Sequence, residues 1–174
     1  MPKHSFAPVL GQIDRFVLDS KLLKNRLGDP TSREIIVHIS PKGIDLISKG
    51  KKLPTIIYLA PFTSSGPARA GWKAFSESLL QRHERLVESG EMLPCILVMP
   101  DTFTSLGGNQ FVDSPVLGNW SSWLCNDLKE CIKQRYSCND KFGLVGKSSG
   151  GYGALYNALT KPGHWDAVAS HSGA

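Results

Sequence analysis

The residues best suited to chemistry lie in one glycine-rich stretch, Gly146-Lys147-Ser148-Ser149-Gly150. A serine hydroxyl is a weak nucleophile at neutral pH, so a catalytic serine needs a base for its proton and donors for the oxyanion. The pattern Gly-x-Ser-x-Gly is typical of a nucleophile elbow, a sharp turn from a strand into a helix whose glycines let neighbouring backbone approach closely. We therefore interpret Ser148 as the attacking residue of a serine esterase.

The sequence on both sides of this stretch has the order that an elbow requires. Phe142-Gly143-Leu144-Val145 predicts a short buried strand, and residues 151–159 predict a helix. Two alternatives use the same residues. The first is a glycine-rich turn with a purely structural role. The second is a phosphate-binding P-loop, which would need a glycine five positions before Gly146, where Lys141 stands instead.

Two backbone N–H groups are expected to bind the oxyanion. The N–H groups in the first turn of a helix have no partner within the helix and point toward its N-terminal end, so Ser149 supplies the first candidate. The second donor of such a site comes from the loop after an earlier strand, here residues 59–63. Pro61 has no N–H, which leaves Phe62 or Thr63; the alternative is that this segment is a plain loop.

Strands and helices are expected to alternate along the chain. Apolar or β-branched runs predict strands, and apolar residues at helical spacing predict helices. The expected strands are 33–40, 55–60, 95–99, 142–146 and 167–170, and the expected helices are 71–89, 120–136 and 151–159. Residues 1–32 are expected to be irregular, and 41–52 and 102–119 to be connecting segments. Together they predict one α/β domain over residues 1–174, with a mostly parallel sheet between helices.

In such a sheet the functional residues lie at the carboxyl ends of the strands. Asp101 and His171 each follow an expected strand, so both are possible pocket residues, as is Thr63. We further interpret Asp101 as an anchor for the loop that follows it. His38 and His83 are interpreted as surface residues of a strand and of a helix.

The composition argues against several classes of function. The chain has 174 residues and a net charge of +5, and its Lys and Arg residues are scattered, so no nucleic-acid partner is expected. It lacks a run of about 18 apolar residues, so no membrane span is expected. Its four cysteines, Cys95, Cys125, Cys131 and Cys138, match neither a zinc site nor a CxxC pair. With no secretory signal recognised, we expect a cytoplasmic protein, and its oligomeric state stays open.

Four segments together resemble a known family. They are residues 58–63, 101–108, 146–154 and 170–173. These segments resemble the Putative esterase family of α/β-hydrolases, which includes esterase D (S-formylglutathione hydrolase), enterochelin-esterase-like proteins, feruloyl esterases and mycolyltransferases. The resemblance runs from about Arg33 to Ala174. It implies an α/β-hydrolase fold that hydrolyses small carboxylic esters or thioesters, and we expect no metal and no organic cofactor.

The resemblance also implies roles for individual residues. It makes Ser148 the nucleophile and assigns the oxyanion site to the N–H groups of Ser149 and Phe62. Two departures, Pro61 where relatives often have glycine and Lys147 where they often have histidine, affect the expected substrate more than the chemistry. The alternatives are an acyltransferase of the same fold, which differs only in what deacylates the serine, and a noncatalytic fragment that keeps the fold.

The acid and the histidine of the triad should follow the serine in that order. His164 and Asp166 precede the last expected strand and therefore lie at the wrong end of the sheet, roughly 15–20 Å away. His171 lies at the correct end, and we expect it to line the pocket rather than to act as the base. The resemblance implies that the acid and the histidine lie beyond Ala174. We therefore expect an N-terminal part of a longer enzyme, truncated after the strand near residue 170, with little esterase activity of its own.

Overall fold

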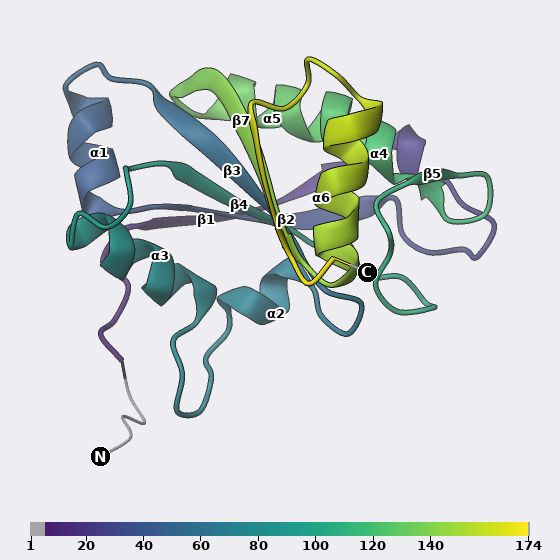
Figure 1. Cartoon of the computed structure of the whole chain (residues 1–174), viewed down its shortest axis with the longest axis horizontal. Helices are drawn as coiled ribbons and strands as arrows, with labels where there is room; N and C mark the ends of the chain where they lie inside the picture. Colours follow the sequence, from purple (N-terminus) through teal and green to yellow (C-terminus); the bar gives the residue numbers. More distant parts are fainter. Residues whose placement is uncertain (1–5, 174) are drawn as a thin grey trace.

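The computed structural model describes residues 6–173, and its centre is a six-stranded sheet (Figure 1). The strands of this sheet are β1 (Gln12–Asp19), β2 (Ser32–Ile39), β3 (Leu53–Leu59), β4 (Ile96–Pro100), β7 (Cys138–Lys147) and β8 (Ala167–His171). The α-helices are α1 (Pro41–Ser48), α2 (Gly66–Ala70), α3 (Leu79–Glu88), α4 (Trp120–Trp123), α5 (Lys129–Arg135) and α6 (Ser149–Thr160). The shorter elements are a 3-10 turn η1 (Lys21–Leu23), a π-helical segment η2 (Leu124–Leu128), and the two-residue strands β5 (Asp113–Ser114) and β6 (Gly118–Asn119).

The strand order is β1-β2-β4-β3-β7-β8. Strands β4, β3, β7 and β8 run parallel to one another, whereas β2 is antiparallel to both β1 and β4. This arrangement confirms the predicted mostly parallel α/β sheet with helices on both faces. Because β3, β7 and β8 are neighbours, their carboxyl ends form one continuous edge, and the Gly-x-Ser-x-Gly stretch lies at that edge directly after β7.

Helices cover the two faces of the sheet to different extents. On one face α4, η2, α5 and α6 enclose a large buried cluster that includes Trp120, Trp123 and Phe142; we call this the closed face. The opposite face carries α2 and α3 (Figure 1), and its buried cluster contains Ile36, Leu80, Leu97 and Met99. We call this second face the open face, because α3 does not reach across β7 and β8.

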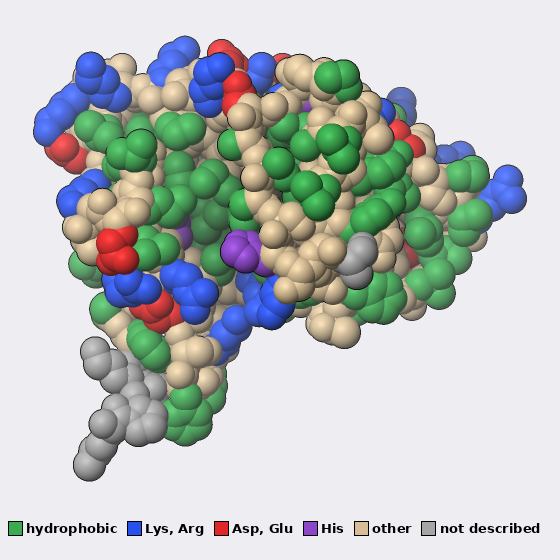
Figure 2. All heavy atoms as spheres, viewed as in Figure 1, with side chains coloured by type: hydrophobic (Ala, Val, Ile, Leu, Met, Phe, Trp, Pro, Cys, Tyr) green, Lys and Arg blue, Asp and Glu red, His purple; other side chains and the backbone are tan. Residues whose placement is uncertain are grey.

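The gap on the open face is an apolar hollow of about 300 Å³ between α3 and the last two strands. Ile56, Leu86, Val145 and Ala169 are among the residues that line it. Figure 2 shows hydrophobic side chains gathered in this hollow, between α3 and β8. The hollow leaves apolar surface of the last two strands uncovered. Covering that surface would contribute about 25 cal/mol of stabilisation per Å² buried.

The expectation that residues 1–32 are irregular is wrong for the part that the structure describes. Strand β1 pairs with β2 along its whole length, from Gln12 opposite Ile39 to Asp19 opposite Ser32. Phe16 and Leu18 are half-buried while the residues between and beside them are exposed. That alternation of burial has the period of a strand, but the sequence does not show it, because the exposed Val17 is apolar like its two neighbours.

Two helix boundaries differ from the predicted ones because of side-chain caps. The segment 41–52 was expected to be a connection but begins with α1, in which the Ser40 hydroxyl accepts the Gly43 N–H at 3.2 Å and Pro41 fills the first position. The helix expected over 71–89 begins only at Leu79, where Ser78 and Gln81 form a capping box. The helices expected over 120–136 and 151–159 are present. Within residues 6–173, no helix combines the length and the hydrophobicity of a membrane span.

His38 and His83 are buried, which corrects the prediction that both lie at the surface. Their Nδ1 atoms lie 2.7 Å apart, His38 Nε2 lies 3.2 Å from a Glu84 carboxylate oxygen, and His83 Nε2 lies 3.2 Å from Cys95 Sγ. Burial lowers the pKa of both histidines, that of His83 to about 3, and raises the pKa of the Cys95 thiol to about 12. One arrangement of protons satisfies every contact while both imidazole rings stay neutral. The Cys95 thiol donates to His83 Nε2, His83 Nδ1 donates to His38 Nδ1, and His38 Nε2 donates to the Glu84 carboxylate. The four side chains therefore form a buried polar network between β2, α3 and the start of β4.

Candidate active site

Ser148 lies on the turn that joins β7 to α6, outside the helix. Its backbone has φ 54° and ψ −122°, a conformation that costs a non-glycine residue on the order of 1–3 kcal/mol. A Cβ atom on Gly146 would lie 2.1 Å from the carbonyl oxygen of Gly150, and a Cβ atom on Gly150 would lie 2.0 Å from that of Leu59. The two glycines are therefore required by close backbone contact on the closed face, as the elbow pattern demands.

Backbone hydrogen bonds hold the turn from both sides. The Ser148 N–H donates to the carbonyl of His171 at 2.9 Å, which ties the turn to the end of β8. The Ser148 carbonyl accepts the N–H of Tyr152 at 2.9 Å in the first turn of α6. The serine side chain is half-buried, and within residues 6–173 its hydroxyl makes no hydrogen bond to another side chain. The hydroxyl is thus presented at the sheet edge by a rigid backbone.

Two N–H groups near this turn make no hydrogen bond to the described part of the chain. One belongs to Ser149, the first residue of α6, and the other belongs to Phe62 in the loop after β3. The Phe62 loop is fixed by its carbonyl, which accepts the Gly108 N–H at 2.7 Å. The contact between Gly150 and Leu59 brings the start of α6 against the end of β3, three residues before Phe62. Thr63 follows in the same turn and is exposed.

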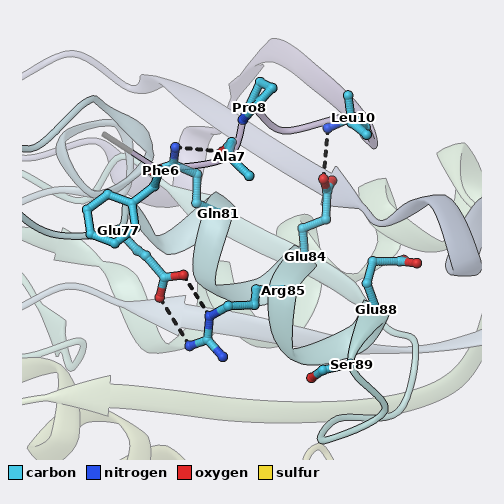
Figure 3. Close-up of a pocket in the computed structure, with 10 residues that line it drawn as sticks. All are labelled: Phe6, Ala7, Pro8, Leu10, Glu77, Gln81, Glu84, Arg85, Glu88 and Ser89. Atoms are coloured by element: carbon cyan, nitrogen blue, oxygen red, sulfur yellow. Dashed lines mark hydrogen bonds and ion pairs between the residues drawn. The ribbon is translucent and has the colours of Figure 1, made fainter. Parts of the chain in front are cut away.

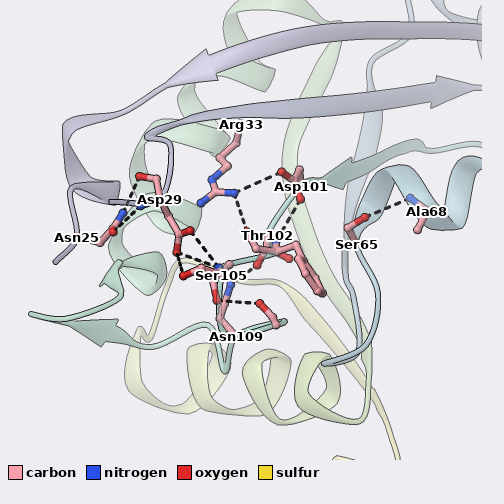
Figure 4. A network of polar contacts seen from close by, with 12 residues as sticks. Asn25, Asp29, Arg33, Ser65, Ala68, Asp101, Thr102, Ser105 and Asn109 are labelled. Atoms are coloured by element: carbon pink, nitrogen blue, oxygen red, sulfur yellow. Dashed lines mark hydrogen bonds and ion pairs between the residues drawn. The ribbon is translucent and has the colours of Figure 1, made fainter. Parts of the chain in front are cut away.

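The segment that supports Phe62 is anchored by a polar network at the end of β4 (Figure 4). The Asp101 carboxylate accepts the Phe103 N–H at 3.1 Å and lies 3.4 Å from Arg33 Nη1, which also donates to the Phe103 carbonyl at 2.7 Å. Asn109 Nδ2 donates to the Thr102 carbonyl at 2.7 Å and closes the loop. These contacts favour the interpretation of Asp101 as an anchor for its own loop.

The histidines and the aspartate that follow Ser148 lie at the two opposite ends of the last strands. Asp166 accepts hydrogen bonds from the Lys141 ammonium and from the Phe142 N–H, both at 2.9 Å, near the amino-terminal part of β7. Lys141 and that N–H lower the pKa of Asp166. The carbonyl of His164 accepts the Lys129 ammonium nearby. His171 is the last residue of β8 and lies beside the elbow. It is exposed and lines a cavity together with Lys147.

The positive charge of that cavity was not predicted from the sequence. We call it the basic cavity. It has a volume of about 510 Å³ and lies between α2, α3 and the carboxyl ends of β3, β7 and β8. Its cationic wall residues are Arg69, Lys73, Arg82 and Lys147. Arg69, Lys73 and Arg82 lie within residues 69–82, whereas Lys147 is 65 residues further along the chain, so no local pattern brings all four together.

A larger cavity, about 680 Å³, lies away from the elbow between the N-terminal segment and α3 (Figure 3). In it, the Glu84 carboxylate accepts the N–H groups of Leu10 and Gly11 at 2.8 Å, and Arg85 pairs with Glu77 at 2.7 Å. None of the elbow residues lines this cavity. Glu84 thus ties the N-terminal segment to α3, and Gln81 Nε2 adds a hydrogen bond to the Ala7 carbonyl at 2.9 Å.

The mostly parallel α/β sheet and the strand-to-helix turn at Ser148 are typical of α/β-type esterases, and comparison with known proteins places the chain in an esterase family. The model of the family described as Putative esterase matches residues 31–174, so the chain belongs to that family. No curated protein matches the sequence.

Three solved structures illustrate the shared fold. A ferulic acid esterase is 23% identical with a TM-score of 0.72, and 92% of this chain covers 59% of that one. An S-formylglutathione hydrolase from Agrobacterium tumefaciens is 18% identical with a TM-score of 0.68, at 97% and 60% coverage. The enterobactin esterase FES from Shigella flexneri is 19% identical with a TM-score of 0.70, at 97% and 38% coverage. The chain therefore spans between about two fifths and three fifths of the length of these structures.

Proposed function

We propose that this chain carries the nucleophile and the oxyanion site of a serine esterase that acts on small carboxylic esters or thioesters. Membership of the esterase family supports the reaction class. The observation that carries the proposal is the backbone of Ser148, which has a positive φ on a strand-to-helix turn whose flanking glycines have no room for a Cβ atom. A structural turn has no need to hold a serine in a strained conformation at an open edge of the sheet.

In the proposed reaction the Ser148 oxygen attacks the substrate carbonyl carbon and forms a new C–O bond. The carbonyl oxygen becomes an oxyanion, which the N–H groups of Ser149 and Phe62 stabilise by hydrogen bonds. The bond to the alcohol or thiol then breaks, the leaving group takes a proton, and water hydrolyses the acyl-serine. The serine proton passes to a base, as in any serine hydrolase.

The described residues bring no histidine or carboxylate to hydrogen-bonding distance of the Ser148 hydroxyl, so the test asks for one acylation rather than for turnover. The chain is treated with a fluorophosphonate, and the modified residue is identified by peptide mass mapping. We expect one adduct on Ser148 that is absent from Ser148→Ala and unchanged in Ser48→Ala, which alters an exposed serine at the end of α1. A chain that folds but gives no adduct, or reacts equally at several serines, would overturn the proposal in favour of a noncatalytic module.

A further inference from the structure

The basic cavity begins next to the nucleophile. Gly146 and Lys147, which directly precede Ser148, form part of its wall. His171 and Ser172 form another part, and the His171 carbonyl holds the Ser148 N–H at 2.9 Å. A group bound in this cavity therefore lies close enough to Ser148 to be part of the same substrate. Its volume of about 510 Å³ lies within the range of small-molecule sites.

The charges on the cavity wall do not balance. Arg69, Lys73, Arg82 and Lys147 contribute four cations, and Glu77 contributes the one carboxylate among the lining residues. That carboxylate is engaged by Arg85, which does not line the cavity, at 2.7 and 3.1 Å, and it pairs with Arg82 at 3.7 Å. This leaves Arg69, Lys73 and Lys147 without a carboxylate on the wall. In Figure 2, several Lys and Arg side chains lie together just below the centre of the view. The wall therefore presents an excess of positive charge toward its interior.

The cationic groups also have unused hydrogen-bonding capacity. Within residues 6–173, neither Arg69 nor Lys73 nor Lys147 forms an ion pair, and Arg69 Nε is buried without an acceptor. The pKa of Lys73 is lowered by burial and by the nearby charges of Arg69 and Arg82. Like charges held together in a partly buried site are unfavourable until an anion joins them.

We infer that the basic cavity binds an anionic group, a carboxylate or a phosphate, on the ester that Ser148 attacks. This inference rests on the proposed esterase function and names its class of substrate. Tyr58, Leu79 and Val145 form an apolar part of the same wall. An aromatic or short aliphatic part of the substrate would pack against these side chains. Its anionic group would then lie beside Arg69 and Lys73 while the ester carbonyl lies at the elbow.

The kinetic test compares 4-acetoxybenzoate, which carries a negative charge, with its neutral methyl ester, each rate being divided by its rate with hydroxide in the absence of protein. The rate of Ser148 acetylation by each ester is followed by mass spectrometry. We expect its second-order rate constant to be about tenfold higher for the anionic ester at low salt, the size of one charge-assisted contact. In Lys73→Gln this ratio should fall by about fivefold or more. Lys49→Gln, which removes an exposed lysine at the end of α1, should leave the ratio as it is. Added salt should lower the ratio of the unmodified chain as well.

A binding test separates this inference from the esterase proposal. Ser148→Ala is titrated with 4-methoxybenzoate, with its methyl ester and with 4-methoxyphenyl phosphate, and binding is followed by calorimetry. We expect the two anions to bind about tenfold more tightly than the neutral ester, with the tighter of the two identifying the preferred anion. This comparison needs no catalysis, so it decides the inference even if neither ester is hydrolysed.

The outcomes are distinct. If both esters acetylate Ser148 at equal rates and Lys73→Gln changes nothing, the inference is wrong and the esterase proposal stands. If neither ester acetylates Ser148 and the fluorophosphonate gives no adduct, the esterase proposal fails. Equal binding of anion and neutral ester to Ser148→Ala would overturn the inference as well. A preference for the anion that survives in the double variant Arg69→Gln/Lys73→Gln would also overturn it.

Discussion

The closed and open faces of the sheet meet at Ser148, and they shape the site by different means. On the closed face, α6 packs so tightly on the ends of β3 and β7 that a single Cβ atom would collide with backbone. On the open face, the same strands border an apolar hollow and the basic cavity, and side chains form the walls. The contrast indicates that rigid backbone on the closed face positions Ser148, the proposed nucleophile, whereas side chains around free space on the open face form the proposed binding site beside it.

The sharpest way to test this contrast is to add one methyl group on each side of β7. Gly146→Ala places a Cβ against the backbone of α6 and should lower the free energy of unfolding by at least about 3 kcal/mol. Gly143→Ala is the matched control, because its Cβ would meet Ala167 at ordinary distances of 3.5 and 3.7 Å on the open face. Urea denaturation measures both. Equal losses would show that the two faces are equally packed.

Truncating neighbouring side chains should repeat the pattern. Leu144 is 2% exposed in the core of the closed face, so Leu144→Ala should cost about 2–5 kcal/mol. Val145 is half-buried beside the open hollow, and Val145→Ala should cost less than about 1 kcal/mol. The difference between their midpoints of chemical unfolding is the measurement. A Val145→Ala loss as large as that of Leu144→Ala would contradict the comparison.

Acid should weaken the α3 side of the molecule through the buried histidines. The pKa of His83 is about 3 in the folded chain and 6.5 for an unperturbed histidine, which stands for the unfolded chain. Between these pH values the unfolded chain binds one more proton at His83 than the folded chain does. Stability is therefore complete above pH 6.5 and is lost as pH falls, by about 2 kcal/mol at pH 5 from His83 alone. His38 shifts in the same direction despite the opposing Glu84 carboxylate.

Urea denaturation at pH 7.5 and pH 5 checks this pH dependence. His83→Gln should flatten it, whereas His171→Gln, at an exposed position, should leave it unchanged. Stability that is the same at both pH values in the unmodified chain would show that the network is not buried and neutral.

The smallest effect is expected from Ser149→Ala. The Ser149 hydroxyl is buried and makes no hydrogen bond within the described residues, and the proposed role of this residue uses only its backbone N–H. The rate of Ser148 labelling by a fluorophosphonate should therefore change by less than about threefold. A loss of a hundredfold would assign a role to the side chain and would weaken the case that backbone alone sets the nucleophile.

Local patterns predicted the elements of the site that depend on local sequence. The elbow was predicted because its strand, turn glycines and helix all lie within about a dozen residues, and the loop anchored by Asp101 follows its strand directly. Caps were also local signals, and Ser40-Pro41 and the pair Ser78 and Gln81 could have set the helix boundaries.

The remaining features depend on contacts between distant segments. His38 meets His83 and Cys95 only after β2, α3 and β4 have packed, so a histidine in isolation could not reveal its burial. The basic cavity likewise combines a lysine of the elbow with cations from α2, α3 and the loop between them. Scattered charges in the sequence therefore became one cluster in space.

The most direct test of the central claim is a crystal structure of the chain after reaction with a fluorophosphonate. The account predicts a phosphonyl group on Ser148 whose oxygen lies about 2.7–3.1 Å from the backbone nitrogens of both Ser149 and Phe62. An adduct whose oxygen points to solvent, with both N–H groups unengaged, would contradict it.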